Sequence, residues 1–93
     1  MSRTAPRVYV DQTEIDHLKR LQQELDAELM VELNLRDGTT LVGTLADRPT
    51  IQQFRGPDGS EGTNGQIRID LGRGDIRDLW LDEVAHYTRM GSS

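Results

Sequence analysis

The spacing of hydrophobic positions changes from helical to alternating near residue 30. Between residues 12 and 28, apolar side chains recur every three or four positions, within an arc of about 120° at about 100° per residue. Asp11 precedes this stretch, and its pairing with Glu14 fits a capping box better than Thr13 with Asp16. The pattern predicts one amphipathic helix over residues 12–28 that packs on another element. Its apolar stripe consists of Ile15, Leu18, Leu21, Leu25 and Leu29.

From residue 30 onward, apolar and polar residues alternate, which is typical of half-buried antiparallel strands. The turn at Asp37-Gly38 allows two registers. A two-residue loop places Leu33 opposite Val42, whereas a three-residue loop with a left-handed Gly38 places Leu33 opposite Leu41. We favour the second register, because a slip of one residue would turn every side chain to the other face. The chain is expected to form five or six short strands, at about residues 30–35, 39–45, 50–54, 66–71, 76–81 and 85–90.

The remaining segments have no regular pattern. Residues 1–10 are interpreted as a loose arm with anchoring contacts through Val8, Tyr9 and Val10. The glycine-rich stretch 56–65 is expected to be a long mobile hairpin loop, and residues 91–93 a frayed tail. The predicted organisation is therefore one domain, residues 1–93: an arm (1–10), a helix (12–28), a barrel (30–90) and a tail (91–93).

Composition narrows the class of protein. The 93 residues carry a net charge of −5, which argues against a DNA- or RNA-coating protein driven by bulk positive charge. The chain has no cysteine, so disulfides and thiolate metal sites are excluded. No apolar run exceeds three residues, and the first ten residues lack the hydrophobic region of a signal peptide. We therefore expect a cytoplasmic protein without a membrane partner.

Two segments resemble the motifs of the Sm family. Residues 31–45 match the first Sm motif, with alternating apolar positions, the Asp37-Gly38 turn, and Gly43 followed two positions later by Leu45. Residues 79–87 are similar to the second motif. In total, the resemblance covers about residues 13–55 and 79–90, and it points to a small bacterial group of unknown function with a variant Sm-like barrel. It implies a mainly β fold with one N-terminal α-helix and a small, strongly bent antiparallel barrel of five or six strands, in which Gly43 lets one strand bend.

The chain departs from the Sm pattern where family members bind RNA. At the family's base-reading positions it has Arg48, Pro49 and Gln53, and Trp80-Leu81 replaces the family's Arg-Gly. The resemblance thus implies the barrel more strongly than the RNA site. Trp80 is interpreted as a core or interface residue rather than an exposed stacking platform. The residues retained as possible RNA contacts are Arg48, Gln53, Arg73 and Trp80.

Other chemistry has little support in the sequence. His17 and His86 are far apart and lack the spacing of a metal site, and the serines lie in the tails or the glycine-rich stretch. The acids Asp75, Asp78, Asp82 and Glu83 lack the order of a calcium loop, and we interpret them as a solvated edge. We therefore predict no cofactor, no metal and no enzymatic activity.

These observations favour a non-enzymatic, self-associating binding or scaffolding module with a degenerate RNA site. The alternative is an RNA-binding protein similar to the bacterial Sm-type RNA chaperone. Residues 72–78 are expected to cover the edge through which Sm rings assemble, so a homodimer is favoured over a hexamer or heptamer. This interpretation is compatible with weak RNA binding, and we expect no binding to DNA. Asp37, Gly38 and Gly43 are assigned structural roles.

Overall fold

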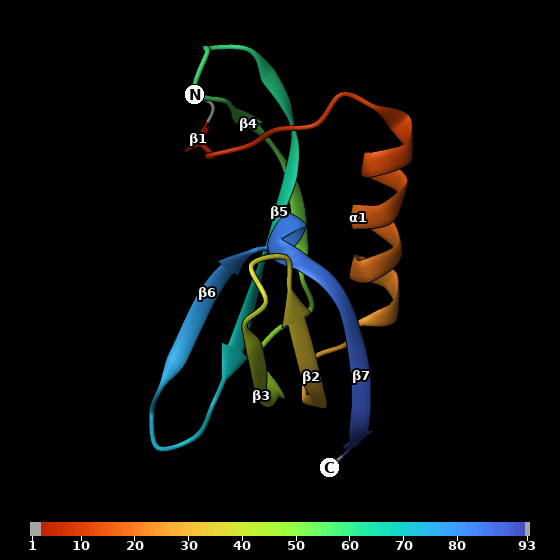
Figure 1. Ribbon diagram of the computed structural model, residues 1–93, viewed down its shortest axis with the longest axis vertical. Helices are drawn as coiled ribbons and strands as arrows, with labels where there is room; N and C mark the ends of the chain where they lie inside the picture. The colour runs from red at the N-terminus through yellow and green to blue at the C-terminus, as the bar shows by residue number, and fades with distance from the viewer. Residues whose placement is uncertain (1–2, 93) are drawn as a thin grey trace.

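A bent β-sheet with one helix beside it makes up the protein (Figure 1). The computed structural model describes residues 3–92. Within them the sheet has seven strands in the order β1-β4-β5-β3-β2-β7, and β6 pairs with the second half of β5. The elements are β1 (Arg3–Thr4), α1 (Gln12–Glu24), β2 (Leu29–Leu35), β3 (Thr40–Leu45), β4 (Thr50–Arg55), β5 (Glu61–Asp70), β6 (Ile76–Trp80), the 3-10 turn η1 (Leu81–Glu83) and β7 (Val84–Ser92).

The predicted fold class, mainly β with one N-terminal helix, is confirmed. Two details differ from the expected antiparallel barrel of five or six strands. The arm adds a short strand, β1, that runs parallel to β4. The sheet is also not closed, because β6 pairs only with β5 among the described residues, and β7 pairs only with β2.

Helix α1 begins where the sequence predicts. Asp11 is the N-cap, and its carboxylate accepts a hydrogen bond from the Thr13 amide. The helix ends earlier than the predicted residue 28, because the backbone of Leu25 is already extended and Glu28 is left-handed with a φ of 69°. Leu29 therefore belongs to β2, although it continues the apolar stripe of the helix.

The predicted register of the first hairpin is correct. Leu33 lies opposite Leu41 and Val31 opposite Gly43. Gly38 is left-handed with a φ of 92°, and its amide donates to the Leu35 carbonyl at 3.0 Å. The core lies between this hairpin, the second half of β5 and α1. Its buried members are Leu18, Leu21, Leu25, Leu29, Val31, Leu33, Leu45, Ile67, Ile69, Leu81 and Val84.

The glycine-rich stretch 56–65 is not the mobile loop that its composition predicts. Only the turn Gly56–Ser60 leaves the sheet, and the following residues form the first half of β5. Here the glycines serve close packing: a Cβ on Gly65 would lie 2.5 Å from the Thr50 carbonyl oxygen. The chain uses glycine at this point because two backbones and the Leu81 side chain meet there.

Both chain ends are more regular than predicted. Tyr9 and Thr63 exchange backbone hydrogen bonds of 2.9 and 2.8 Å, which fixes the arm against β5. Val10, an expected anchor, is instead 80% exposed. In the predicted tail, Gly91 and Ser92 pair with β2, while Ser93 lies outside the described residues.

Candidate functional site

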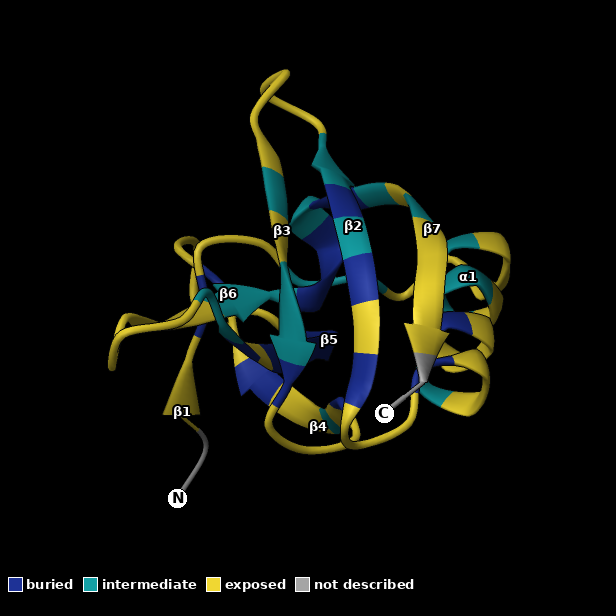
Figure 2. Ribbon diagram, turned by 90° about the horizontal axis from the view of Figure 1, so that it is seen from below, coloured by how far each residue is buried: buried dark blue, intermediate teal, exposed yellow. Residues whose placement is uncertain are grey.

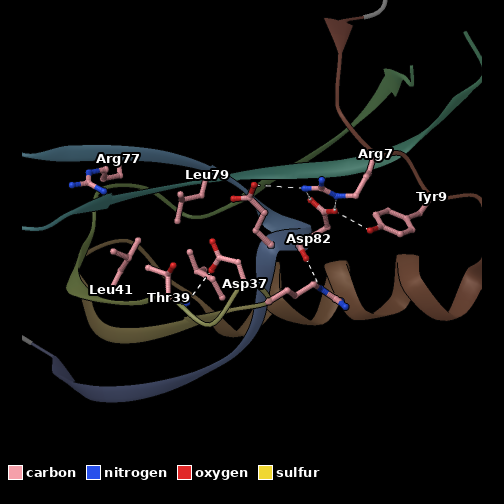
Figure 3. A pocket seen from close by; sticks show the side chains of 11 residues that line it. Arg7, Tyr9, Asp37, Thr39, Leu41, Arg77, Leu79 and Asp82 are labelled. Carbon is pink, nitrogen blue, oxygen red and sulfur yellow. Dashed lines mark hydrogen bonds and ion pairs between the residues drawn. The ribbon is translucent and has the colours of Figure 1, made fainter. Parts of the chain in front are cut away.

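A cavity of about 670 Å³ opens between the β2–β3 hairpin, β6, η1 and the N-terminal arm (Figure 3). Its apolar part is formed by Leu35, Leu41 and Leu79, which also pack against the core. Arginine, acidic, threonine and tyrosine side chains surround these leucines. The full lining is Arg7, Tyr9, Leu35, Arg36, Asp37, Thr39, Leu41, Arg77, Leu79, Asp82 and Glu83.

The cavity lies where the open sheet leaves a gap between β6 and the β2–β3 hairpin. On β6, Arg77 and Leu79 lie opposite Ile69 and Ile67, so they share the core-facing side of the sheet. Cross-strand partners lie on the same face of a sheet. The hairpin brings Leu41 to the opposite side of the cavity. The adjacent turn is stabilised by Asp37, whose carboxylate accepts a hydrogen bond from the Thr39 amide at 2.9 Å.

A buried carboxylate lies at one end of the cavity. Asp82 is only 2% exposed. Its Oδ2 accepts from Arg7 Nε at 2.5 Å and from the Tyr9 hydroxyl at 2.8 Å, and its Oδ1 accepts from Asn64 Nδ2 at 3.1 Å. Buried charges require such pairing, because an isolated carboxylate loses its hydration without compensation. Figure 3 shows Arg7 and Tyr9 reaching Asp82 from the arm.

This network shifts the pKa values of its members. Burial alone would raise the pKa of Asp82, but hydrogen bonds from Arg7, Tyr9 and Asn64 outweigh it and lower the pKa below its ordinary value. The hydrogen bond to Asp82 raises the pKa of Arg7. Burial, together with the hydrogen bond to Asp82, raises the pKa of Tyr9. Asp82 is therefore ionised at neutral pH, while Arg7 is charged and Tyr9 neutral.

Neighbouring backbone groups complete the network. Asn64 Nδ2 also donates to the Arg7 carbonyl at 2.8 Å, and its Oδ1 accepts from the Gly65 amide at 2.7 Å. Arg36 Nε donates to the Asp82 carbonyl at 2.7 Å, which attaches the hairpin turn to η1. The arrangement ties the arm and β5 to the carboxylate of Asp82 and the hairpin turn to its backbone carbonyl. These hydrogen bonds occupy the oxygens of Asp82 and stabilise one wall of the cavity.

Asp82 and its neighbours correct the interpretation of the acidic residues as a uniformly solvated edge. Asp75 and Asp78 do lie at the surface, in ion pairs with Arg77 and Arg68. Asp82 differs because η1 turns its side chain inward. Residues 3–92 contain no group of three or more His, Asp or Glu side chains placed to hold a metal ion.

The structure does not bring the four possible RNA contacts together. Gln53 donates to the Thr63 hydroxyl at 2.8 Å, and Arg48 forms an ion pair with Asp26. Arg73 lies in the exposed turn before β6, whereas Trp80 is at the other end of that strand. These four side chains therefore do not line a common pocket.

Trp80 packs partly against the protein. Its ring meets that of buried Phe54 edge-to-face, with the centroids 5.1 Å apart, and the Arg3 guanidinium lies 6.0 Å from the Phe54 centroid. A hollow of about 320 Å³ beside them contains three arginines; it is lined by Arg3, Asp47, Arg48, Thr50, Gln66, Ile67, Arg68 and Asp78. Of the four predicted contacts, Arg48 is in this lining, and Trp80 is the cross-strand partner of Gln66 there.

Arg7, Tyr9 and Asn64 are not predicted from the sequence as parts of a site. Their partners lie 73 to 75 residues away for the arm and 18 away for Asn64, so no local pattern links them. One signal was present: Asp82 lies between apolar residues Leu81 and Val84, at a point where the chain must turn. The two histidines remain apart, His17 on α1 and His86 on β7.

The strand order, the close crossing at Gly43 and the 3-10 turn before the last strand define a variant of the Sm-like fold. The chain is similar to a solved structure, XC5848 from Xanthomonas campestris, which is described as adopting a novel variant of the Sm-like motif. The two chains are 36% identical, the alignment covers 98% of this chain and 100% of the other, and the TM-score is 0.91. The resemblance to the Sm family is thus confirmed at the level of the fold.

The chain belongs to the family described as Domain of unknown function (DUF3247), whose profile matches residues 2–90. No match was found among curated proteins. Among the described residues, no helix is long and apolar enough to span a membrane.

Proposed function

We propose that this protein is a non-enzymatic, cytoplasmic binding module that self-associates as a homodimer through the free edge of β7. The proposal depends chiefly on one observation. β7 runs for nine residues, from Val84 to Ser92, and pairs only with β2 among the described residues. A long free strand edge is a template for pairing with another chain. Figure 2 shows that most of β7 is exposed, in contrast to β2 beside it.

The side chains on the outer face of β7 favour pairing. His86 and Thr88 lie opposite Asn34 and Glu32 of β2, on the face turned away from the core. Neither carries a permanent charge, and nearby Met90 is half exposed. Met30 and Val42 add exposed apolar side chains to the same face of β2 and β3, on which Glu32 is the charged residue between Thr88 and Val42. Uncharged, partly apolar edges are those that associate most readily.

The free edge of β6 is less suited to association. β6 has only five residues, and Arg77 and Asp78 place two charges in the middle of it. Inward or central charges on an edge strand oppose pairing. Residues 72–78, which were expected to cover the edge used in Sm rings, form a turn and the first three residues of β6, and these three pair with β5. A ring would have to join this charged edge to β7, whereas a dimer joins β7 to its own copy.

The geometry of β7 suggests where the twofold axis would lie. Within the sheet, the backbone groups of Glu32 and Thr88 point toward each other, so those of Tyr87 and Arg89 point to the free edge. An antiparallel copy centred on Thr88 would pair Tyr87 with Arg89 of the other chain and His86 with Met90. No like charges would then lie opposite each other.

Light scattering after size-exclusion chromatography tests the proposal. The wild-type protein is expected to have the mass of two chains at about 100 μM. Thr88→Lys should shift it to one chain, because it places two ammonium groups opposite each other, whereas Thr88→Val should leave the dimer intact. A wild-type mass of one chain, or an unchanged mass for Thr88→Lys, would refute pairing through β7.

RNA binding is the second candidate, and the arginine-lined hollow beside Trp80 favours it. Arg3, Arg48 and Arg68 line this hollow, and the half-buried Trp80 ring offers part of its surface for stacking. However, Arg48 and Arg68 are engaged by Asp26 and Asp78. Together with the net charge of −5, these ion pairs favour weak binding over strong binding.

A further inference from the structure

We infer that the free edge of β3 is a docking site for an extended peptide segment of another protein, with an apolar side chain that enters the cavity beside Asp82. This site is separate from the β7 edge proposed for self-association. β3 pairs with β2 from Thr40 to Thr44 but with β5 only at Thr44 and Leu45. Among the described residues, the first part of β3 thus has a strand on one side only.

The hydrogen-bond pattern identifies the backbone groups that are free. The Leu35 amide donates to the Thr39 carbonyl at 2.8 Å, which sets the alternation along the hairpin. By that alternation, Leu41 and Gly43 bond toward β2, and Thr40 and Val42 direct their N–H and C=O groups outward. Both residues are exposed. β5 would be expected to satisfy them, but its chain turns away after Asp70 into the Gly72–Asp75 turn.

The space on each side of this edge is hollowed. On the inner side is the cavity with Leu35, Leu41 and Leu79. On the outer side is a groove of about 340 Å³, lined by Met30, Val42, Gly43, Thr44, Asp70, Leu71 and Gly72. Side chains of a β-strand point alternately to the two faces of a sheet. A strand added to β3 would therefore place one side chain in the inner cavity and its two neighbours against the outer groove.

These features specify the occupant. Only an extended backbone can satisfy the groups of both Thr40 and Val42, and aliphatic side chains match the leucines within and Met30, Val42 and Leu71 outside. The run of free edge between the hairpin turn and Thr44 accommodates about three residues. The segment therefore has three consecutive apolar residues in extended conformation, the central one facing the cavity. Basic flanking residues would complement the chain's net charge of −5.

A synthetic peptide tests this inference directly. The probe is the fluorescein-labelled peptide Lys-Thr-Val-Leu-Val-Thr-Lys, with acetylated and amidated ends, and the readout is fluorescence anisotropy. We expect saturable binding with a dissociation constant below about 1 mM. Replacing the central Leu of the peptide by Asp should weaken binding at least about tenfold, because its carboxylate would lie against the leucines of the cavity and beside the ionised Asp82.

Backbone methylation of the peptide separates edge pairing from simple apolar contact. The two Val residues would lie opposite Thr40 and Val42, so methylating their nitrogens should weaken binding at least about tenfold. The central Leu nitrogen would point to solvent, and its methylation should have little effect. Equal losses for the two methylated peptides, or a dissociation constant above about 1 mM for the parent peptide, would overturn the inference. Thr88→Lys protein should bind the probe as wild type does, and loss of binding there would place the peptide on β7 instead.

Discussion

At the scale of single residues, Gly43 determines how closely β3 and β5 approach. A Cβ at this position would lie 2.3 Å from the Asp70 carbonyl oxygen and 3.1 Å from Ile69 Cγ1. Because backbone, rather than the end of a flexible side chain, occupies that space, the strands would have to separate. From the sequence, Gly43 is expected to let the strand bend; in the structure, the glycine makes room for the backbone of β5 at Asp70.

We expect Gly43→Val to lower the free energy of unfolding by about 2 kcal/mol or more, through steric conflict with Asp70. Chemical denaturation of both proteins measures this difference. Thr40→Val is the matched control, since it adds a valine to the exposed part of the same strand and should be nearly neutral. An unchanged midpoint for Gly43→Val would mean that β5 does not cross β3 at this point.

Asp82 gives the fold a dependence on pH. Its pKa is lowered in the folded protein, so its stabilising contribution is complete above the ordinary carboxyl pKa of about 4 and is lost as the pH falls below it. Asp82→Asn should cost about 2 kcal/mol at pH 7 and should flatten the stability profile below pH 4. Urea denaturation from about pH 2.5 to 7 measures both effects.

Asp78→Asn is the control for Asp82, because Asp78 also pairs with an arginine but at the protein surface. It should leave the stability at pH 7 nearly unchanged. If the two variants were equally stable at pH 7, the buried network around Asp82 would not anchor the arm.

At the scale of elements, the sequence predicted the features that depend on residues close together along the chain. The N-cap at Asp11 and the hairpin register follow from spacing and turn chemistry, and the structure agrees. The arm and the stretch 56–65 were misinterpreted for one common reason. Gly62 lies between the polar residues Glu61 and Thr63, yet the arm packs against Gly62 and pairs with Thr63. That contact joins residues more than fifty positions apart, so composition alone suggested disorder.

The arm is expected to behave as part of the sheet in solution. The amides of Tyr9 and Thr63 donate to each other's carbonyls, and they should exchange with solvent far more slowly than the exposed amide of Val10. Asp82→Asn should accelerate exchange at Tyr9 by releasing Arg7 and the Tyr9 hydroxyl. Amide hydrogen exchange followed by NMR reports each site. Unprotected exchange at Tyr9 in the wild-type protein would restore the interpretation of the arm as loose.

At the scale of the whole molecule, the open sheet leaves several features of residues 3–92 without a partner, among them the edge of β7, the edge of β3 and the cavity beside Asp82. The sequence predicted an Sm-like fold but not its opening. Closure depends on whether β6 reaches another strand, and no local signal encodes that distance. The cavity beside Asp82 therefore lies where core side chains would be packed in a closed barrel.

The affinity for RNA depends on the net charge of the whole molecule and on the arginines at its surface. With a net charge of −5 and Arg48 engaged by Asp26, we expect no binding to oligouridine tighter than about 10 μM at physiological salt. Fluorescence anisotropy with a labelled RNA of six to ten nucleotides decides this. A sub-micromolar dissociation constant that weakens in Trp80→Ala or Arg48→Ala would contradict the expectation.

Disulfide trapping tests the β7 dimer most directly, because the chain contains no cysteine of its own. In the proposed pairing, the two Thr88 residues face each other across the twofold axis as a non-hydrogen-bonded pair, with Cα atoms about 4.5 Å apart, which suits a disulfide. Under mild oxidation, Thr88→Cys should form a covalent dimer nearly completely on a non-reducing gel, while Ile76→Cys on β6 should stay monomeric. A covalent dimer from Ile76→Cys and none from Thr88→Cys would contradict assembly through β7.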